Sequence, residues 1–403
     1  MRRRSAATQT LWGLFVPVYL PWMTGGLGVA MVIPILPVYL TDSGLSFSLA
    51  SVVLAGGGMG AMLGGLPVGA MLGRLGEHRV LLVSLAVMGI ATITLGVTTA
   101  VIGLTVMRVA HGAGQIGLRL SRQTFITRTV DTKIRGRSMA LMGGSMRFAM
   151  LVGPILGGVL VDQVGYSWTF AISGMATLSG LIPAILSQER QNDETGGSPA
   201  STSREGALWP ALRRHRRVLL VGGLGPALIM AVRQGRTIII PLIGDSLDMS
   251  ASAIGFLVAV GTGADLLLFP MAGLVMDRFG RLAAIVPAFS LIGIGMLVLS
   301  SAETVTTVLV AGVIMGIGNG LGSGSMLTLG SDLAPEDSPG QFLSALASIQ
   351  NLGRIIGPMM VGCFADAAGL SVAAIALAVT VFVALAWIML LVGETGKHTG
   401  TPV

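Results

Sequence analysis

Residues 69–77 read Gly-Ala-Met-Leu-Gly-Arg-Leu-Gly-Glu, and residues 273–281 read Gly-Leu-Val-Met-Asp-Arg-Phe-Gly-Arg. Two glycines and an arginine agree, because residues 69, 74 and 76 recur 204 positions later as residues 273, 278 and 280. The same offset relates further pairs: Pro37 and Pro241, Gly112 and Gly316, Gly114 and Gly318, Gly136 and Gly340, Gly153-Pro154 and Gly357-Pro358. Agreement at one constant offset indicates an internal duplication.

Long apolar stretches flank both copies of this motif. Of the 403 residues, 53% are hydrophobic and only 11% are charged, whereas soluble domains carry about 25% charged residues. Stretches such as 81–99 and 372–392 are about 20 residues long, which is enough to cross roughly 30 Å of hydrocarbon. We therefore predict an all-α integral membrane protein with twelve spans, at 11–38, 48–71, 80–98, 100–120, 138–161, 168–187, 217–242, 252–276, 282–300, 304–330, 341–364 and 370–392.

The basic residues predict the orientation of these spans. The connections near residues 42, 99, 163, 246, 302 and 366 contain no Lys or Arg, whereas the N-terminus and the connections 72–79, 122–137, 188–217 and 277–281 are basic. Because cytoplasmic loops are enriched in Lys and Arg, both termini are predicted to lie in the cytoplasm of a multi-pass inner-membrane protein. The same pattern accounts for the net charge of +7, so no nucleic-acid partner is expected.

The repeat also predicts the domains. Residues 1–187 form one six-helix bundle, 188–216 a polar cytoplasmic linker, and 217–403 a second six-helix bundle with a short cytoplasmic tail. Two pseudo-symmetric bundles of this kind enclose a cavity near mid-membrane, and rocking of one against the other exposes that cavity to each side in turn. The organisation predicts a transporter whose partners are the lipid bilayer, a small-molecule substrate and protons.

Three motifs resemble those of the major facilitator superfamily. Residues 273–281 resemble its cytoplasmic loop signature, although the first copy has Gly73 where an Asp is usual, and Arg108-Val-Ala-His-Gly-Ala-Gly114 resembles its arginine motif. Gly144, followed by Gly153-Pro154-Ile-Leu-Gly157-Gly158, resembles the motif of its drug/proton antiporter branch. The resemblance implies that superfamily's fold and proton-coupled efflux of small organic or drug-like compounds by alternating access.

The motif residues have two expected roles. A conformational latch on the cytoplasmic side is expected from Asp277, Arg278, Gly280, Arg281, Arg74 and Gly76, with Arg135 or Arg137 as the partner of Asp277. Close helix packing is expected at Gly144, Gly153, Pro154, Gly157, Gly158, Gly357 and Pro358, because glycines let backbones approach and proline bends a span.

Charges inside a membrane span are costly and point to function. Asp265 is the one carboxylate deep in a predicted span, at a depth similar to that of Arg233. The two can form a structural bridge, or Asp265 can carry the proton, because burial favours a protonated carboxyl and a nearby arginine favours the ionised form. His111 and Arg108 are further candidates for proton coupling, although a glycine-flanked histidine can also serve packing alone.

The remaining intramembrane polar residues are candidate substrate ligands: Arg147, Arg233, Arg236, Arg354, Asn351, Gln115 and Asn319. Because guanidinium forks suit carboxylate or phosphate groups, an importer or exchanger of an organic anion is the alternative to efflux. A non-transporting membrane receptor on the same scaffold is a second alternative.

Enzymatic and metal chemistry are not expected. The single cysteine, Cys363, cannot form an intramolecular disulfide, and the sequence has no cluster with metal-ligand spacing. Gly244-Asp-Ser246 imitates a hydrolase motif but lies in a short loop without the required strand. We predict a monomer with no metal or cofactor, driven by a proton gradient.

Overall fold

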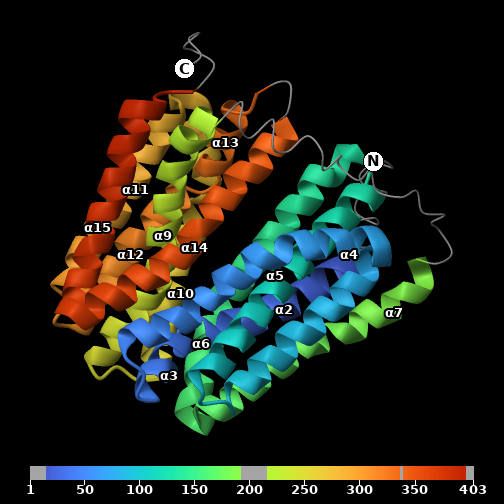
Figure 1. Cartoon of the computed structure of the whole chain (residues 1–403), viewed down its shortest axis with the longest axis horizontal. Helices are drawn as coiled ribbons and strands as arrows, with labels where there is room; N and C mark the ends of the chain where they lie inside the picture. The colour runs from blue at the N-terminus through green and yellow to red at the C-terminus, as the bar shows by residue number, and fades with distance from the viewer. Residues whose placement is uncertain (1–14, 192–215, 336–338, 396–403) are drawn as a thin grey trace. The chain divides into compact units, whose positions relative to one another are not determined.

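The computed structural model describes residues 15–191, 216–335 and 339–395. Most of the predicted linker 188–216 and the two ends of the chain lie outside these residues. The described residues form helices and no strands, as shown in Figure 1: η1 (Phe15–Tyr19), α2 (Leu20–Val32), α3 (Ile35–Asp42), α4 (Phe47–Leu95), α5 (Val101–Thr129), α6 (Thr132–Ser179), α7 (Leu181–Gln191), α9 (Arg216–Ser246), α10 (Ala251–Phe279), α11 (Arg281–Ser300), α12 (Val305–Leu321), α13 (Ser325–Asp332), α14 (Pro339–Ala368), α15 (Leu370–Trp387) and η3 (Ile388–Val392). The predicted all-α class is confirmed.

Glycine turns divide the longest helices. Gly76 in α4 and Gly165 in α6 have φ values of +78° and +79°, so each of these elements is two helices joined at a kink. Gly280, between α10 and α11, and Gly369, between α14 and α15, have φ values of +94° and +90°. Residues 280 and 369 follow 76 and 165 at the offset of the repeat, and only glycine adopts such φ values without strain. The duplication seen in the sequence therefore recurs in the backbone.

The apolar spans agree with the predicted membrane architecture. Within the described residues, eight stretches are long and apolar enough to cross a membrane. Two of them, Phe47–Leu95 and Ile134–Ser187, contain the glycine kinks and so correspond to two predicted spans each. Helices α5 and α14, which are not among the eight, match the predicted spans 100–120 and 341–364. The described helices thus account for all twelve predicted spans.

Contacts divide the chain into two compact units. The first comprises Met1–Tyr39 and Gly56–Thr202, and the second comprises Leu40–Ala55 and Ser203–Val403. The break after residue 202 falls inside the predicted linker. Residues 40–55, which the sequence places in the N-terminal bundle, group with the second unit.

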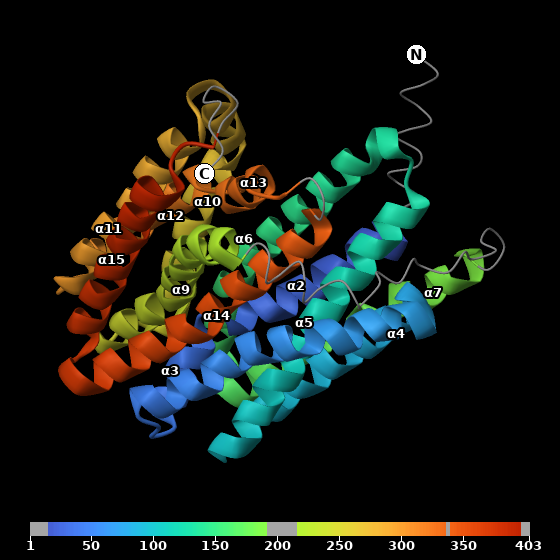
Figure 2. The same cartoon turned by 45° about the horizontal axis from the view of Figure 1, so that its top comes forward.

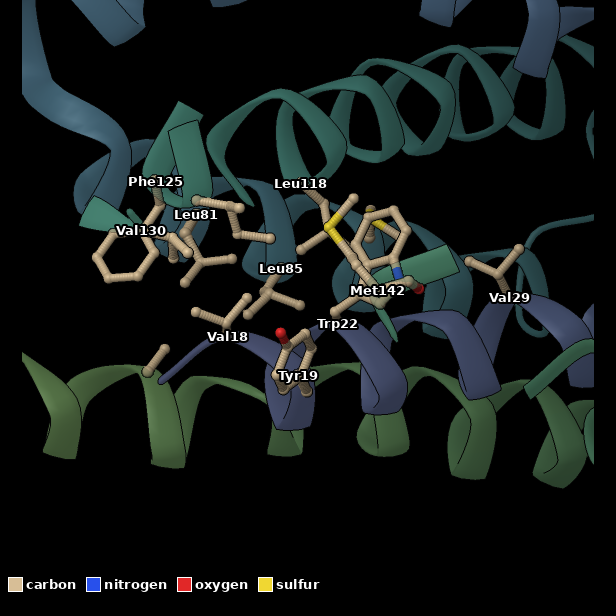
Figure 3. Packing of buried hydrophobic residues seen from close by; sticks show 13 residues of the cluster. Val18, Tyr19, Trp22, Val29, Leu81, Leu85, Leu118, Phe125, Val130 and Met142 are labelled. Atoms are coloured by element: carbon tan, nitrogen blue, oxygen red, sulfur yellow. The ribbon is translucent and has the colours of Figure 1, made fainter. Parts of the chain in front are cut away.

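The first unit packs around α2. Trp22 donates a hydrogen bond from Nε1 to the carbonyl oxygen of Met142 at 2.9 Å, and Tyr19 donates from its hydroxyl to the carbonyl of Ser138 at 3.4 Å. Both rings therefore tie α2 or its preceding turn to α6 while their apolar faces stay in the core. Figure 3 shows the surrounding cluster, which is buried: Val18, Val29, Leu81, Leu85, Met88, Leu118, Phe125, Ile126, Val130 and Ala184.

Glycines of α6 and α14 allow close approach to a neighbouring helix. A Cβ on Gly157 would overlap the carbonyl oxygen of Met31 in α2, and a Cβ on Gly153 would overlap the Cβ of Ala30. In the second unit, Gly357 of α14 lies against the carbonyl oxygen of Ala231 in α9. Pro154, Gly158 and Pro358 are buried. Gly144 differs from these positions, because a Cβ there would meet no atom of the described residues within 4 Å. The close packing expected at Gly144 stays a prediction.

In the second unit, α9 packs against α14 and α15, α11 packs against α12 and α15, and α10 packs against α12 (Figure 2). Without a hydrophobic driving force in lipid, such contacts are stabilised by close van der Waals packing and by hydrogen bonds between helices.

A carboxylate of α14 caps the first turn of α4 within the second unit. Asp366 accepts hydrogen bonds from the backbone nitrogens of Phe47, at 2.9 Å, and Ser48, at 2.8 Å. Gly362, one turn earlier, has no room for a Cβ because Ser51 and the carbonyl of Phe47 lie against it. The free N–H groups at a helix start carry partial positive charge, so the carboxylate stabilises this end of α4.

This cap predicts a pH-dependent effect of Asp366→Ala. Hydrogen bonds, first from the Ser48 side chain and then from the backbone of Ser48 and Phe47, hold the pKa of Asp366 below its ordinary value. A lowered pKa means that the cap contributes stability above an ordinary carboxyl pKa of about 3.9 and loses it as the pH falls through the folded value. We expect the purified variant to melt roughly 2 °C below wild type at neutral pH.

The melting difference should close only below about pH 4. Asp366→Asn, which keeps one acceptor oxygen, is expected to lie between the two proteins. A difference that stays constant down to about pH 3 would show that the cap does not titrate as described.

Candidate functional site

Asp265 is the centre of a polar cluster inside the second unit. This residue of α10 is 9% exposed and accepts a hydrogen bond, at 2.8 Å, from Nδ2 of Asn319 in α12. Arg236 of α9 lies close enough for its guanidinium to interact electrostatically with the Asp265 carboxylate, and its Nη1 donates to the carbonyl oxygen of Met315 at 3.0 Å. Three helices therefore supply an acid, an amide and a guanidinium to one buried region.

Glycines bring the acid and the amide together. A Cβ on Gly316 of α12 would overlap the carbonyl oxygen of Gly261 in α10, and one on Gly320 would lie 2.6 Å from the carbonyl oxygen of Asp265. The backbones of α10 and α12 therefore cross in direct contact. Residues four apart lie on one face of a helix, so Asp265, four residues after Gly261, faces α12 just beyond this crossing.

The first unit repeats the crossing without the acid. A Cβ on Gly112 of α5 would overlap the carbonyl oxygen of Gly57 in α4, and these glycines are the counterparts, 204 residues earlier, of Gly316 and Gly261. At the positions that correspond to Asp265 and Asn319, the first copy has Ala61 and Gln115. The two halves share a helix crossing but not its chemistry.

Near its crossing the first unit instead holds two basic residues, Arg108, which is partly buried, and His111, which is buried. The guanidinium of Arg108 occupies the space beside Gly57, because a Cβ there would lie 2.8 Å from its Nη2. Its Nε is buried and has no hydrogen-bond partner among the described residues. His111 is 6% exposed and lies within the electrostatic influence of Arg108. The predicted proton-coupling residues are thus divided, with Arg108 and His111 in the first unit and Asp265 in the second.

The predicted substrate ligands divide in the same way. Arg147 and Gln115 belong to the first unit, and Arg233, Arg236, Asn319, Asn351 and Arg354 to the second. Asn319 is buried and the others are partly buried. Within the second-unit set, Asn319 donates a hydrogen bond to Asp265, and Arg236 interacts with it electrostatically. The ion pair between Arg233 and Asp265 stays a prediction.

The latch motif of the second unit is held by acids from α13 and from the segment after η3. Arg281 donates from Nε to Asp332 at 2.8 Å and lies 3.8 Å from Asp277. Glu394 accepts hydrogen bonds from the backbone nitrogens of Arg281, at 2.7 Å, and Leu282, at 2.9 Å, which caps the start of α11. Within the second unit, the motif arginine therefore joins the loop, the end of α13 and the segment after η3.

The corresponding pair of the first unit has exchanged signs. Arg128 donates to Glu77 at 2.9 Å, and residues 77 and 128 are the counterparts of Arg281 and Asp332. The repeat offset therefore indicated Asp332 as a partner of Arg281, which the motif alone did not. Among the other latch candidates, Arg74, Arg137 and Arg278 are exposed, and Arg135 donates to the carbonyl of Val130 at 3.4 Å.

Comparisons with known proteins agree on one family. The family model described as Major Facilitator Superfamily matches residues 23–358 and 223–402. An uncharacterised MFS-type transporter of Methanocaldococcus jannaschii is 20% identical over 357 residues, which cover 88% of this chain and 92% of that protein. The class C tetracycline resistance protein of Escherichia coli is 26% identical over 342 residues, covering 83% of this chain and 85% of that protein.

Solved structures show the same fold. The crystal structure of a bacterial homolog of the human lysosomal transporter Spinster, in an inward-facing and unoccupied conformation, superposes with a TM-score of 0.75 at 17% sequence identity. The superposition covers 96% of each chain. The fold expected from the sequence motifs is therefore confirmed.

Proposed function

This chain belongs to the major facilitator superfamily and is a multi-pass membrane transporter, and we propose that it exports small organic, drug-like compounds by proton antiport. The observation that carries the proposal is the buried carboxyl of Asp265, which accepts a hydrogen bond from Asn319 and interacts electrostatically with Arg236. A buried carboxyl favours its neutral form, whereas a nearby guanidinium favours the ionised form. Movement of the arginine relative to the acid during alternating access would therefore bind and release a proton.

The substrate class rests on different support. The relative named for tetracycline resistance matches most of this chain, and residues 144–158 resemble the antiporter branch. We propose tetracycline as the first probe compound. The basic connections further support an inner-membrane protein with both termini in the cytoplasm, so that export runs from the cytoplasm outward. We propose that it acts as a monomer.

The experiment that tests this proposal uses the purified protein in proteoliposomes. A lumen more acidic than the medium should drive accumulation of tetracycline, and a protonophore should abolish it. Resistance of a pump-deficient bacterial strain to a panel of compounds would extend the substrate range. Tetracycline accumulation at the same rate with and without a pH gradient would reject proton coupling. Binding of tetracycline without any flux would favour a receptor.

A second candidate function is exchange of an organic anion. The observation that favours it is Arg108, whose buried Nε has no hydrogen-bond partner among the described residues and which lies beside His111. Both basic groups lie within a predicted span of the first unit, and guanidinium is suited to carboxylate or phosphate. An anionic substrate would supply the charge that stabilises them.

Arg108→Gln separates the two functions. Loss of one charge-assisted hydrogen bond, worth about 1.5–3 kcal/mol, is expected to weaken binding of an organic anion by roughly ten- to hundredfold. Fluorescein exchange between vesicle and medium at equal pH, measured with Arg108→Lys as the charge-conserving control, reports this loss. If wild type exchanges no anion, while tetracycline responds to the pH gradient, the anion function is rejected.

A further inference from the structure

The side-chain amide of Asn319 forms a hydrogen bond through its nitrogen but not through its oxygen, among the residues that the structure describes. Its Nδ2 donates to Oδ2 of Asp265 at 2.8 Å. Its Oδ1 is buried and has no hydrogen-bond partner among the residues that the structure describes. The whole residue is 6% exposed. A buried amide oxygen without a partner is costly, so its retention beside the buried carboxylate of Asp265 calls for a reason.

The chemistry of the two groups gives that reason. An ionised carboxylate only accepts hydrogen bonds, so the amide nitrogen faces Asp265 in the charged state. A protonated carboxyl carries an O–H donor, which requires an acceptor. The two ends of a carboxamide have nearly the same shape, and rotation by a half-turn about the last side-chain bond exchanges the donor for the acceptor without needing additional space.

We propose that Asn319 is the positioning residue of the proton site and that its carboxamide turns over when Asp265 binds a proton. The nitrogen donates to the carboxylate, and the oxygen accepts from the carboxylic acid. The Asp265 side chain thereby keeps one hydrogen bond and one orientation in both states of the transport cycle. This inference rests on the proposed role of Asp265 as the proton carrier.

The surroundings of the pair suit such a switch. Helix α12, which carries Asn319, contains no charged residue, and the only charged residue of α11 is Arg281 at its first position. Asp332, at the end of α13, is paired with Arg281. Helix α9 contributes Arg236 and also contains Arg233 and, near its end, Asp245. Asp265 therefore interacts with an amide that can serve either protonation state and with Arg236, which favours the charged state.

The repeat provides an internal comparison. In the first unit the counterpart of Asn319 is Gln115, and the counterpart of Asp265 is Ala61. Both halves thus have a carboxamide at the helix crossing, but only the second half has an acid, Asp265, at the position that can bond it. The switch is consequently expected in the second half alone.

Solid-state NMR of the full protein in lipid tests the inference directly. The sequence contains three asparagines, Asn192, Asn319 and Asn351, so asparagine labelled with ¹³C and ¹⁵N gives three side-chain amides. The signal of Asn319 is identified by its disappearance in Asn319→Gln. Without substrate, over about pH 4–9, both its ¹³Cγ and its ¹⁵Nδ2 signals are expected to move with a single midpoint. Asp265→Asn should abolish both movements.

Two outcomes would overturn the inference in different ways. Movement of ¹⁵Nδ2 with a fixed ¹³Cγ would show that the amide stays a donor, which leaves the proton role of Asp265 intact. No movement of either signal would show that Asp265 does not titrate in this range, which also removes the proposed carrier. The flux assay then decides independently whether transport is proton-coupled.

Transport by two variants gives a second readout. Asn319→Ser keeps a group that both donates and accepts, whereas Asn319→Leu keeps neither. We expect tetracycline uptake driven by pH to fall about tenfold in the leucine variant and less than about threefold in the serine variant. Thr262→Val is the control, because the Thr262 hydroxyl, about one turn from Asp265, donates a hydrogen bond to the Val258 carbonyl of its own helix. Equal rates in the serine and leucine variants would overturn the inference.

Discussion

Asp265→Asn is expected to reduce pH-driven uptake of tetracycline to the level of protein-free vesicles, a loss of at least about tenfold. The amide has the shape of the carboxyl, so it preserves packing at the crossing of α10 and α12, but it cannot bind and release a proton. Counterflow exchange of tetracycline at equal pH should survive, because it needs alternating access without proton transfer. Measuring both activities on one preparation distinguishes a loss of proton coupling, which abolishes uptake alone, from a loss of folding, which abolishes both.

The matched control is Glu303→Gln, which makes the same chemical change at an exposed carboxylate after α11. This variant should retain pH-driven uptake. Unchanged uptake by Asp265→Asn would remove Asp265 from the mechanism and leave the acid as a structural partner of Asn319. Loss of both uptake and counterflow, with a folded protein, would assign Asp265 to substrate binding instead.

Gly316→Val is expected to be among the most destabilising single substitutions in the second unit. A Cβ at this position overlaps the carbonyl oxygen of Gly261, and backbone atoms cannot swing aside as a flexible side chain can. Forcing α10 and α12 apart costs roughly 1–3 kcal/mol, occasionally more, and separates Asn319 from Asp265. The melting temperature of the detergent-solubilised protein, and its yield as a monodisperse species, measure this effect.

Gly112→Val should behave similarly, because Gly112 meets Gly57 in the corresponding crossing of the first unit. Gly144→Ala is the control, since its surroundings are open and alanine favours a helix over glycine by about 0.5–1 kcal/mol. Comparable losses in the control and in Gly316→Val would show that close approach at the crossing does not stabilise the fold.

The sequence was sufficient to predict the membrane architecture. The length of the apolar stretches and the repeat offset predict the twelve spans, and the two glycines of the motif copies, Gly76 and Gly280, adopt the positive φ values that end a span sharply. Such features depend on local chemistry, since a hydrocarbon layer selects helices of a fixed length and a left-handed residue selects glycine.

The contacts of the site depended on more than spacing. Depth along a helix predicts which residues can be neighbours, but rotation about the helix axis decides which side chains meet. The sequence therefore identified Asp265 and Asn319 as separate candidates without predicting that they bond. Gly144 matched a family motif, yet a Cβ at this position of α6 would meet none of the described residues within 4 Å.

Long-range caps were harder still to predict. Asp366 and Glu394 each stabilise the start of a helix more than 100 residues away. Nothing in the local sequence of either acid distinguishes a capping carboxylate from a solvated one. One long-range contact could be predicted from the duplication. The ion pair of Glu77 and Arg128 occupies the positions that correspond to Arg281 and Asp332, with the charges exchanged.

The most direct test of proton-coupled export is to measure substrate and proton movement in the same proteoliposomes. With tetracycline outside and an acidic lumen, the account predicts accumulation of tetracycline together with alkalinisation of the lumen, reported by an enclosed pH dye. Both signals should be absent in Asp265→Asn. Accumulation of tetracycline without any proton movement in the wild-type protein would contradict the account.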